Sequence, residues 1–367
     1  MTDKTFIDEV MGFDPAKVVT AFETGSSEKR VNPNIYKTNP ANSVNEDGHY
    51  HAKVRILINP FDISKSIVHQ ARYAMKDDKG FFSAVSSLSV GDKECPIFKG
   101  WKQLWFATIQ DPSDPTKRVP DEAKKAWARA KFQKNESDWV LVQIIEDENQ
   151  PELVGTFKAM KLPKAILNRL LAKMNPTDAK KQKQPLMDYL FGPVLDLDVA
   201  PGPDDPNAPE RKQREISYDL CDFDSEPCPI INVDGTQLFS DEELEMIEEY
   251  NTANNDSIKA KTQAKRDEAI KKKESLAGEI RPLYAKAIEV IKANAINIVE
   301  VCGYTPWTQE LTARIQNWLN AVVNMEDPEA LPWDRTAPAS TEAADIDPTP
   351  YESAPADEDD GLDGLPF

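Results

Sequence analysis

Cysteine, histidine and glycine are scarce in this chain of 367 residues, which has 4 Cys, 3 His and 14 Gly beside 28 Pro. The cysteines lie far apart and form no Cys-x-x-Cys pair, which predicts free thiols in a reducing compartment rather than a disulfide framework. No apolar run reaches about 18 residues, so the sequence predicts no membrane-spanning helix. The segment after Met1 lacks a basic stretch followed by an apolar one, so we expect no export signal and a cytoplasmic location.

Motifs of the common enzyme classes are also missing. The sequence contains no GxxxxGK[ST] phosphate loop, no GxGxxG, no GxSxG and no HExxH. Neither a recognisable nucleophile nor a paired carboxylate accompanies His49, His51 or His69. His49 and His51 with Cys95 do not have the paired spacing of a closed zinc site, because the position three after Cys95 is Phe98. We therefore expect no catalytic residue, no metal and no cofactor.

Charge is distributed unevenly along the chain. The formal net charge is −19, from 44 Lys and Arg against 63 Asp and Glu. Residues 51–185 hold 24 basic and 16 acidic side chains, 196–249 hold 3 basic and 17 acidic ones, and 336–367 hold 9 acidic and no basic ones. This pattern predicts a polyanion-binding surface in the front half and acidic segments that solubilise it or compete with its ligand. The alternative is an ordinary solvated surface of mixed charge.

Hydrophobic periodicity divides the chain into four parts and indicates an α+β protein. We expect an N-terminal arm over 1–35, a mainly β domain over 36–240, an α-helical module over 241–325 and a disordered acidic tail over 326–367. The alternation at 49–60 predicts a half-buried strand with Lys53 and Arg55 on its outer face.

Other expected elements follow from alternation, turn residues and helix caps. Strands are expected at 139–146, 153–160, 190–199 and 229–233, and a hairpin at 66–90 around Asp77-Asp78-Lys79-Gly80. Helices are expected at 15–22, 121–134 and 164–174. In the helical module, a capping box at Ser240 opens a helix at 241, further helix runs from 257 to 301, and Thr305-Pro306 starts the last helix. These helices are expected to form a helical hairpin or a small bundle.

Cations alternate with aromatic rings throughout the basic half. Single-stranded nucleic acid is bound by this combination, because cations neutralise phosphates and flat rings stack on bases. For the rings inside apolar runs, namely Trp105, Phe106, Trp139 and Phe157, the sequence favours a core position, whereas for Tyr73 and Trp101 both interpretations stay open. The candidate DNA-binding residues are Lys53, Arg55, Arg72, Tyr73, Lys76, Lys79, Phe81, Lys99, Trp101, Lys102, Arg129, Lys131, Lys134, Lys158 and Lys161.

The chain ends in an acidic cluster followed by Leu-Pro-Phe. This end resembles the C-terminal tip of bacterial single-stranded DNA-binding proteins. In such a tip the terminal ring fills an apolar pocket while basic residues of a partner bind the carboxylate. The alternative is an acidic tail whose final ring has no partner. The candidate tip residues are Asp357, Glu358, Asp359, Asp360, Asp363, Leu365, Pro366 and Phe367.

The front half, from about 35 to 235, resembles the single-stranded DNA-binding (helix-destabilising) protein of T-even-type bacteriophages. Four motifs carry the resemblance in the same order as in that family. They are Tyr36-Lys37 to Ile58-Asn59-Pro60, Ile67 to Cys95-Pro96-Ile97-Phe98, Lys134 to Trp139-Val-Leu-Val with the block Val154-Gly155-Thr156-Phe157-Lys158, and the helix at 164–174.

The resemblance implies an elaborated oligonucleotide-binding (OB) β-barrel that binds single strands without marked sequence preference. In that family a Cys-Pro-Val-Cys knuckle helps to hold zinc, whereas here only Cys95 stands at a matching place. We therefore predict that this subdomain lacks zinc and is held by apolar packing. Only Lys29-Arg30 corresponds to the basic arm motif linked to cooperativity, so the extent of cooperative binding is not predicted.

The sequence thus predicts a protein that coats single-stranded DNA in phage replication, recombination and repair, in the cytoplasm of the infected bacterium. Its expected partners are single-stranded DNA, replication and recombination proteins at the C-terminal tip, and further copies of itself along the strand. One alternative is a single-strand annealing recombinase. Another is an interaction or scaffold protein whose β domain holds protein rather than DNA.

Overall fold

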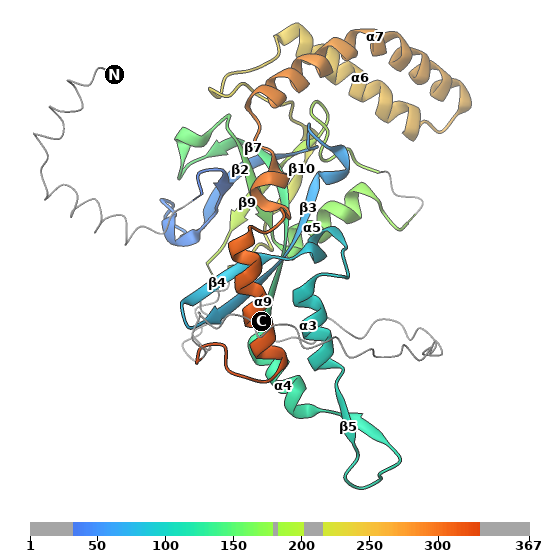
Figure 1. Ribbon diagram of the computed structural model, residues 1–367. Helices are drawn as coiled ribbons and strands as arrows, with labels where there is room; N and C mark the ends of the chain where they lie inside the picture. Colours follow the sequence, from blue (N-terminus) through green and yellow to red (C-terminus); the bar gives the residue numbers. More distant parts are fainter. Residues whose placement is uncertain (1–31, 179–182, 202–215, 331–367) are drawn as a thin grey trace, which may run out of the picture.

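A large open β-sheet forms the centre of the protein (Figure 1). The computed structural model describes residues 32–178, 183–201 and 216–330. Within them the eight-stranded sheet has the order β1-β8-β7-β2-β9-β10, with β3 paired to β7 and β4 paired to β3. The strands are β1 (Ile35–Tyr36), β2 (Tyr50–Leu57), β3 (Ile67–Asp77), β4 (Gly80–Val85), β7 (Gln133–Asp147), β8 (Phe157–Leu162), β9 (Pro193–Val199) and β10 (Asp222–Pro227).

The sheet is mixed, because β1 runs parallel to β8 while the other pairs are antiparallel. The outermost strands of its path, β1 and β10, do not pair with each other in the described residues. The predicted closed barrel is therefore not confirmed, whereas the predicted α+β class is.

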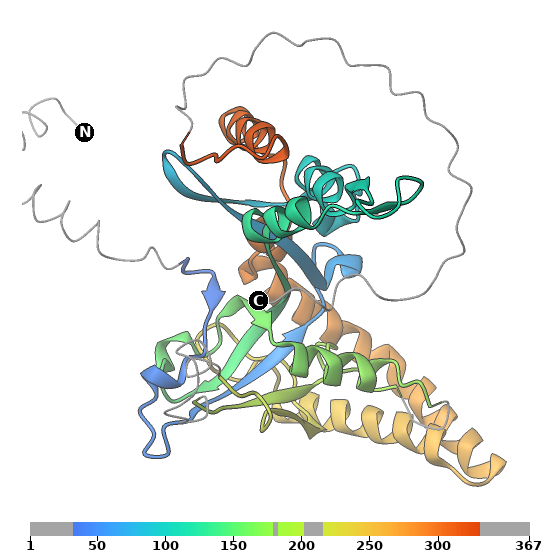
Figure 2. The same ribbon diagram turned by 90° about the horizontal axis from the view of Figure 1, so that it is seen from below.

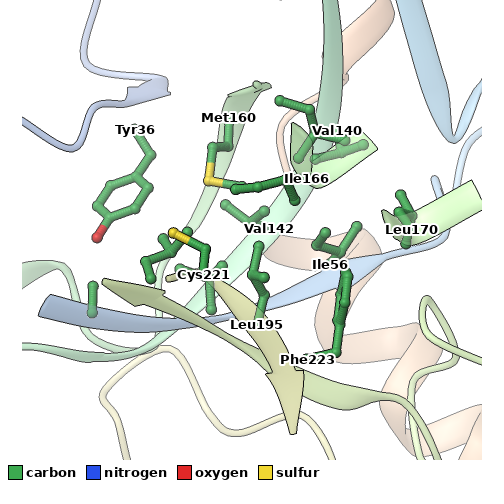
Figure 3. Packing of buried hydrophobic residues seen from close by; sticks show 14 of the residues in the cluster. Tyr36, Ile56, Val140, Val142, Met160, Ile166, Leu170, Leu195, Cys221 and Phe223 are labelled. Carbon is green, nitrogen blue, oxygen red and sulfur yellow. The ribbon is translucent and has the colours of Figure 1, made fainter. Parts of the chain in front are cut away.

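One face of the sheet packs against α5 (Lys164–Met174). Val140 and Val142 of β7 point to this face with Ile56 of β2, and Ile166 and Leu170 of α5 cover them (Figure 3). The period-two alternation of β2 and β7 places these residues together. The predicted inward face of β2 is confirmed, because Ala52, Val54 and Ile56 are all buried in this cluster.

The opposite face is covered by α6 (Asp241–Lys259), α7 (Gln263–Asn294) and α8 (Ile298–Cys302). Helices α6 and α7 form a hairpin that extends away from the sheet (Figures 1 and 2). Leu141 of β7 and Ile291 of α7 belong to the shared core on this face. The middle of β7, from Val140 to Ile144, is therefore buried on both sides. No helix of the described ranges is long and apolar enough to cross a membrane.

A third core lies at the other end of the molecule, in a region that we call the hairpin lobe. It consists of the β3–β4 hairpin, α3 (Pro96–Trp105), the small sheet of β5 (Thr108–Gln110) and β6 (Arg118–Pro120), α4 (Glu122–Lys131) and α9 (Gln309–Val323). Figures 1 and 2 show β4, α3, α4 and α9 grouped together, far from the α6–α7 hairpin. The helices of residues 241–325 therefore pack at two places rather than in one bundle.

Most predicted elements are confirmed, with α5 matching 164–174 at both ends. Four predictions are corrected. Residues 96–105 form a helix that was not expected, the strands β5, β6 and β10 were missed, residues 229–233 contribute only an isolated bridge at Ile231, and the last helix begins after Thr308 rather than at Thr305-Pro306. The helix expected at 15–22, most of the N-terminal arm and the tail beyond 330 lie outside the described residues. The proposed domain boundaries stay a prediction.

Candidate functional site

The hairpin lobe collects most of the candidate DNA-binding residues. They come from segments that are distant in the sequence but adjacent in space, because β7 pairs with β3 and α3, α4 and α9 share one apolar core. The pairing sets Tyr73 opposite Lys134. The candidates on these elements are Arg72, Tyr73, Lys76, Lys79, Phe81, Lys99, Trp101, Lys102, Arg129, Lys131 and Lys134.

A stack of aromatic rings follows one side of α3. The ring centroids of Phe98 and Trp101 are 5.7 Å apart, and those of Trp101 and Trp105 are 5.3 Å apart. Cations lie over this stack: the Arg129 guanidinium is 5.5 Å from the Trp105 ring, and Lys125 Nζ is 5.2 Å from it. We call this group the α3 ring stack. It places cations beside flat rings, which is the chemistry that binds a nucleic-acid strand.

Lys102 extends the same arrangement, with its Nζ 5.5 Å from the Phe98 ring. Phe106, directly after α3, is 65% exposed. The sequence favoured a core position for Phe106, and the structure corrects this, because α3 ends at Trp105 and the next ring turns outward. Trp105 is only partly buried, whereas Phe157 is buried as expected.

A cavity of about 280 Å³ lies beside the β3–β4 hairpin, and we call it the hairpin pocket. Phe81 of β4 is 82% exposed, and Lys76 Nζ lies 5.2 Å from its ring. Helix α4 contributes to both the pocket and the α3 ring stack. The lining residues of the pocket are Ala74, Met75, Lys76, Phe81, Ala130, Lys131, Gln133, Trp318 and Glu329.

Two carboxylates from the segment after α9 form ion pairs with the lysines that line this pocket. Glu329 is 2.6 Å from Lys76 Nζ and 3.7 Å from Lys131 Nζ, and Asp327 is 3.0 Å from Lys131 Nζ. The hydrogen bond from Lys131 lowers the pKa of the Asp327 carboxyl. An anion therefore already lies where a phosphate would contact Lys76 and Lys131.

Three candidate residues are corrected because their side chains are inside the protein. Arg55 is 0% exposed, Tyr73 is 2% exposed and Trp101 is 9% exposed. Alternation in β2 directs Arg55 away from the core that lies between the sheet and α5, but the segment from Leu186 to Pro193 covers it on the other face. Tyr73 and Trp101 belong to the apolar core of the hairpin lobe instead. The side chains of these three residues are therefore not presented on the surface.

The remaining candidates have other surroundings. Lys134 pairs with Glu136 at 2.8 Å and its side chain is only 8% exposed, while Lys99 pairs with Glu94. Arg72 donates to Ser83 Oγ at 3.1 Å from the exposed side of the hairpin. Outside the hairpin lobe, Lys53 pairs with Glu146, Lys158 donates to the Pro33 carbonyl, and Lys161 is exposed on β8.

Sequence reasoning missed Lys125 and the role of Phe98. Both follow from helix geometry, because Lys125 and Arg129 are four residues apart and therefore share one face of α4. Residues 96–105 were not expected to be helical. In the helix that they form, Phe98, Trp101 and Trp105 fall on one side at helical spacing.

The chain also has a group of side chains that could hold a metal, but it does not include Cys95. The Cys95 thiol is buried in the core of the hairpin lobe, with its Sγ 2.9 Å from Ser86 Oγ. In the described part of the chain, the one group of three suitable ligands is Asp47, His49 and His51. The expected absence of zinc at the Cys95 position stays a prediction.

No protein-family model matches the chain, and no curated protein is significantly similar to it in sequence. The C-terminal tip, from Asp357 to Phe367, lies outside the described residues.

Proposed function

We propose that the chain is a single-stranded DNA-binding protein that coats exposed strands in phage replication, recombination and repair. The observation that carries this proposal is the hairpin lobe, where exposed or half-exposed rings lie directly beside cations in two adjoining groups. The OB fold that the resemblance implies belongs to the same proposal, with the open sheet as its core.

The mechanism is stoichiometric binding. Exposed rings such as Phe81 and Phe106 stack on bases, which contributes about 1–3 kcal/mol per base and needs no particular sequence. Cations around them, including Lys102, Lys125 and Arg129, neutralise phosphates and release counterions. The logarithm of the binding constant then falls with the logarithm of salt concentration, with a slope of about −0.7 per phosphate contacted on a single strand.

The acidic segments regulate access in this proposal. Asp327 and Glu329 form ion pairs with Lys131 and Lys76, so a DNA strand that enters the hairpin pocket has to displace these carboxylates. Residues after 330 continue the acidic sequence to the tip. The tip recruits replication and recombination proteins once the tail is released.

The first test uses fluorescence anisotropy of labelled dT30 and of a duplex of equal length with the full chain at two salt concentrations. We expect dT30 to bind more tightly than the duplex. Phe81→Ala should weaken dT30 binding by about 1–3 kcal/mol, because it removes one stacking ring. Since Phe81 is 82% exposed, its truncation leaves the core intact.

Two variants serve as matched controls. Phe61→Ala removes another exposed ring, in the loop between β2 and β3, and Lys265→Ala removes an exposed cation of α7. Both should bind dT30 as the parent does. Equal binding of single strand and duplex would overturn the proposal and favour a scaffold role. Acceleration of complementary-strand pairing would instead indicate an annealing recombinase.

A further inference from the structure

The loop before β2 brings two imidazoles and a carboxylate together. Asp47, His49 and His51 each offer a ligand atom, and these atoms all lie within 4.8 Å of one another. Asp47 Oδ2 is 3.0 Å from His51 Nε2, and the two imidazole rings are stacked with centroids 6.0 Å apart. Imidazole nitrogen and carboxylate oxygen are the ligands that zinc and related divalent transition metals take in proteins.

The backbone holds this group in place. Asp47 Oδ1 accepts a hydrogen bond from the His49 amide at 2.8 Å, which orients the other carboxylate oxygen toward His51. Gly48 supplies the left-handed turn between the two residues, with φ of 73°, and donates its amide to Asn45 at 3.1 Å. His51 lies on the first part of β2, opposite Asp198 of β9. Three ligands are thus fixed by a turn and a strand rather than by chance contacts of long side chains.

Asp198 supplies the hydrogen-bonding carboxylate that usually orients a metal-binding histidine from behind. Its Oδ1 lies 2.6 Å from His49 Nδ1. A carboxylate bonded to one ring nitrogen fixes the tautomer and leaves the other nitrogen for a metal. Asp198 is therefore a positioning residue and not one of the three ligands.

We propose that Asp47, His49 and His51 form a site for a divalent transition metal ion of the zinc class, with Asp198 orienting His49. The site is separate from the Cys95 region, because Cys95 belongs to the core of the hairpin lobe. It does not depend on the proposed DNA-binding function. A bound ion would join the loop at 43–49 to the start of β2, which pairs with the end of β9.

The test uses the full chain, stripped with a chelator that is then removed, and titrated with Zn²⁺ against a chromophoric competitor. Millimolar Mg²⁺ is kept present to fill weak carboxylate sites in the acidic segments. We expect a single tight equivalent of Zn²⁺ and, with Co²⁺, visible absorption bands of a nitrogen- and oxygen-ligated ion. His49→Ala and His51→Ala should each weaken Zn²⁺ binding at least about tenfold, and Asp198→Asn about tenfold.

His69→Ala is the matched control. His69 also pairs with an aspartate, Asp138, at 3.1 Å, but has no second histidine beside it. It should bind Zn²⁺ and Co²⁺ as the parent does, and circular dichroism checks that all variants are folded. The proposal is overturned if the parent binds no Zn²⁺ in Mg²⁺, or if folded His49→Ala and His51→Ala variants bind Zn²⁺ as tightly as His69→Ala.

Discussion

The alternation of β2 predicts on which face of the sheet the Arg55 side chain lies, but it does not predict what covers that face. Arg55 donates hydrogen bonds to the carbonyl oxygens of Leu186, Asp188 and Pro193, and has no exposed surface. Burial lowers the pKa of its guanidinium to about 10, so the group remains charged at neutral pH. A buried charge is tolerated here because several backbone carbonyls solvate it in place of water.

Gly192 completes this arrangement, and its substitution gives the first prediction. A Cβ at this position would lie 2.5 Å from Arg55 Nη1 and 2.8 Å from the Asp188 carbonyl oxygen. We expect Gly192→Ala to lower the free energy of unfolding by about 1–3 kcal/mol, because the hydrogen-bonded guanidinium cannot move away without losing its partners. Urea unfolding followed by circular dichroism measures the change.

Gly278→Ala is a control in which the same substitution should raise stability instead of lowering it. Gly278 lies inside α7, and a Cβ added there would have no other atom within 4 Å, so alanine should stabilise the helix by about 0.5–1 kcal/mol. An unchanged stability of Gly192→Ala would show that Arg55 is not held where the hydrogen bonds place it.

At the scale of elements, α3 shows why one helix was missed and α9 shows what stabilises it. Gly100 lies in the middle of α3, and glycine lowers helix propensity by about 1 kcal/mol. A Cβ there would be 2.9 Å from Leu319 of α9, so the glycine allows α9 to approach. Tertiary contact between α3 and α9 therefore determines this helix, and local propensity alone does not reveal it.

Two tryptophans and one ion pair attach α9 and the residue Trp307 before it to the β3–β4 hairpin. Trp318 Nε1 donates to the Lys76 carbonyl at 2.9 Å, and Trp307 Nε1 donates to that of Val85 at 2.7 Å. Arg314 makes two 2.7 Å hydrogen bonds to the Asp77 carboxylate at the turn of the hairpin. The last helix thus fixes the β3–β4 hairpin, which carries Lys76 on β3 and Phe81 on β4.

The start of α6 gives an element-scale prediction about pH. The predicted capping box is confirmed, with Glu243 accepting from the Ser240 amide at 2.9 Å, and Glu243 also pairs with Lys286 of α7 at 2.7 Å. These partners, Lys286 first, lower the pKa of Glu243. Its contribution to stability is therefore present above the unfolded-state pKa of about 4.3 and is lost as pH falls through the lower folded-state value.

Glu243→Gln should accordingly reduce the free energy of unfolding by about 0.5–1 kcal/mol at pH 7, and the difference from the parent should shrink below about pH 4. Urea unfolding at both pH values measures this. Glu279→Gln, at an exposed position of α7, should show no such pH-dependent difference. A Glu243→Gln defect that persists unchanged at low pH would contradict the electrostatic origin.

At the scale of the whole molecule, the C-terminal third of the chain packs at both ends of the structure. The α6–α7 hairpin covers the sheet, while the segment after α9 returns to the hairpin pocket with Asp327 and Glu329. A C-terminal truncation at Arg335 would leave both carboxylates in place. Competition from this segment therefore has to be tested by substitution.

Replacing Asp327 by Asn and Glu329 by Gln together should raise dT30 affinity about two- to fivefold at low salt, because exposed ion pairs of this kind contribute up to about 1 kcal/mol. The gain should diminish at high salt, since ions screen the contact. Anisotropy titrations at both salt concentrations measure it. The control is Glu268→Gln with Glu279→Gln, two exposed residues of α7, which changes the net charge equally. An equal gain in the control would mean that only net charge matters.

Local elements of this protein could be predicted from the order of its residues alone. Alternation at 49–60, the turn at Asp77–Gly80, the capping box at Ser240 and the periodic helix at 164–174 all depend on neighbours within a few residues. The interleaving of cations and rings that the hairpin lobe displays was also visible, because composition along the chain needs no fold to be recognised.

Accessibility and proximity, in contrast, were decided by long-range packing. Arg55 is buried because a segment more than a hundred residues later covers it, and Trp101 is buried because α9 packs on α3. Long-range contacts also place Glu329 beside Lys76, and the pairing of distant strands decides that the described sheet is open. Burial depends on contacts between distant segments, and a periodic pattern in one segment carries no information about its partner.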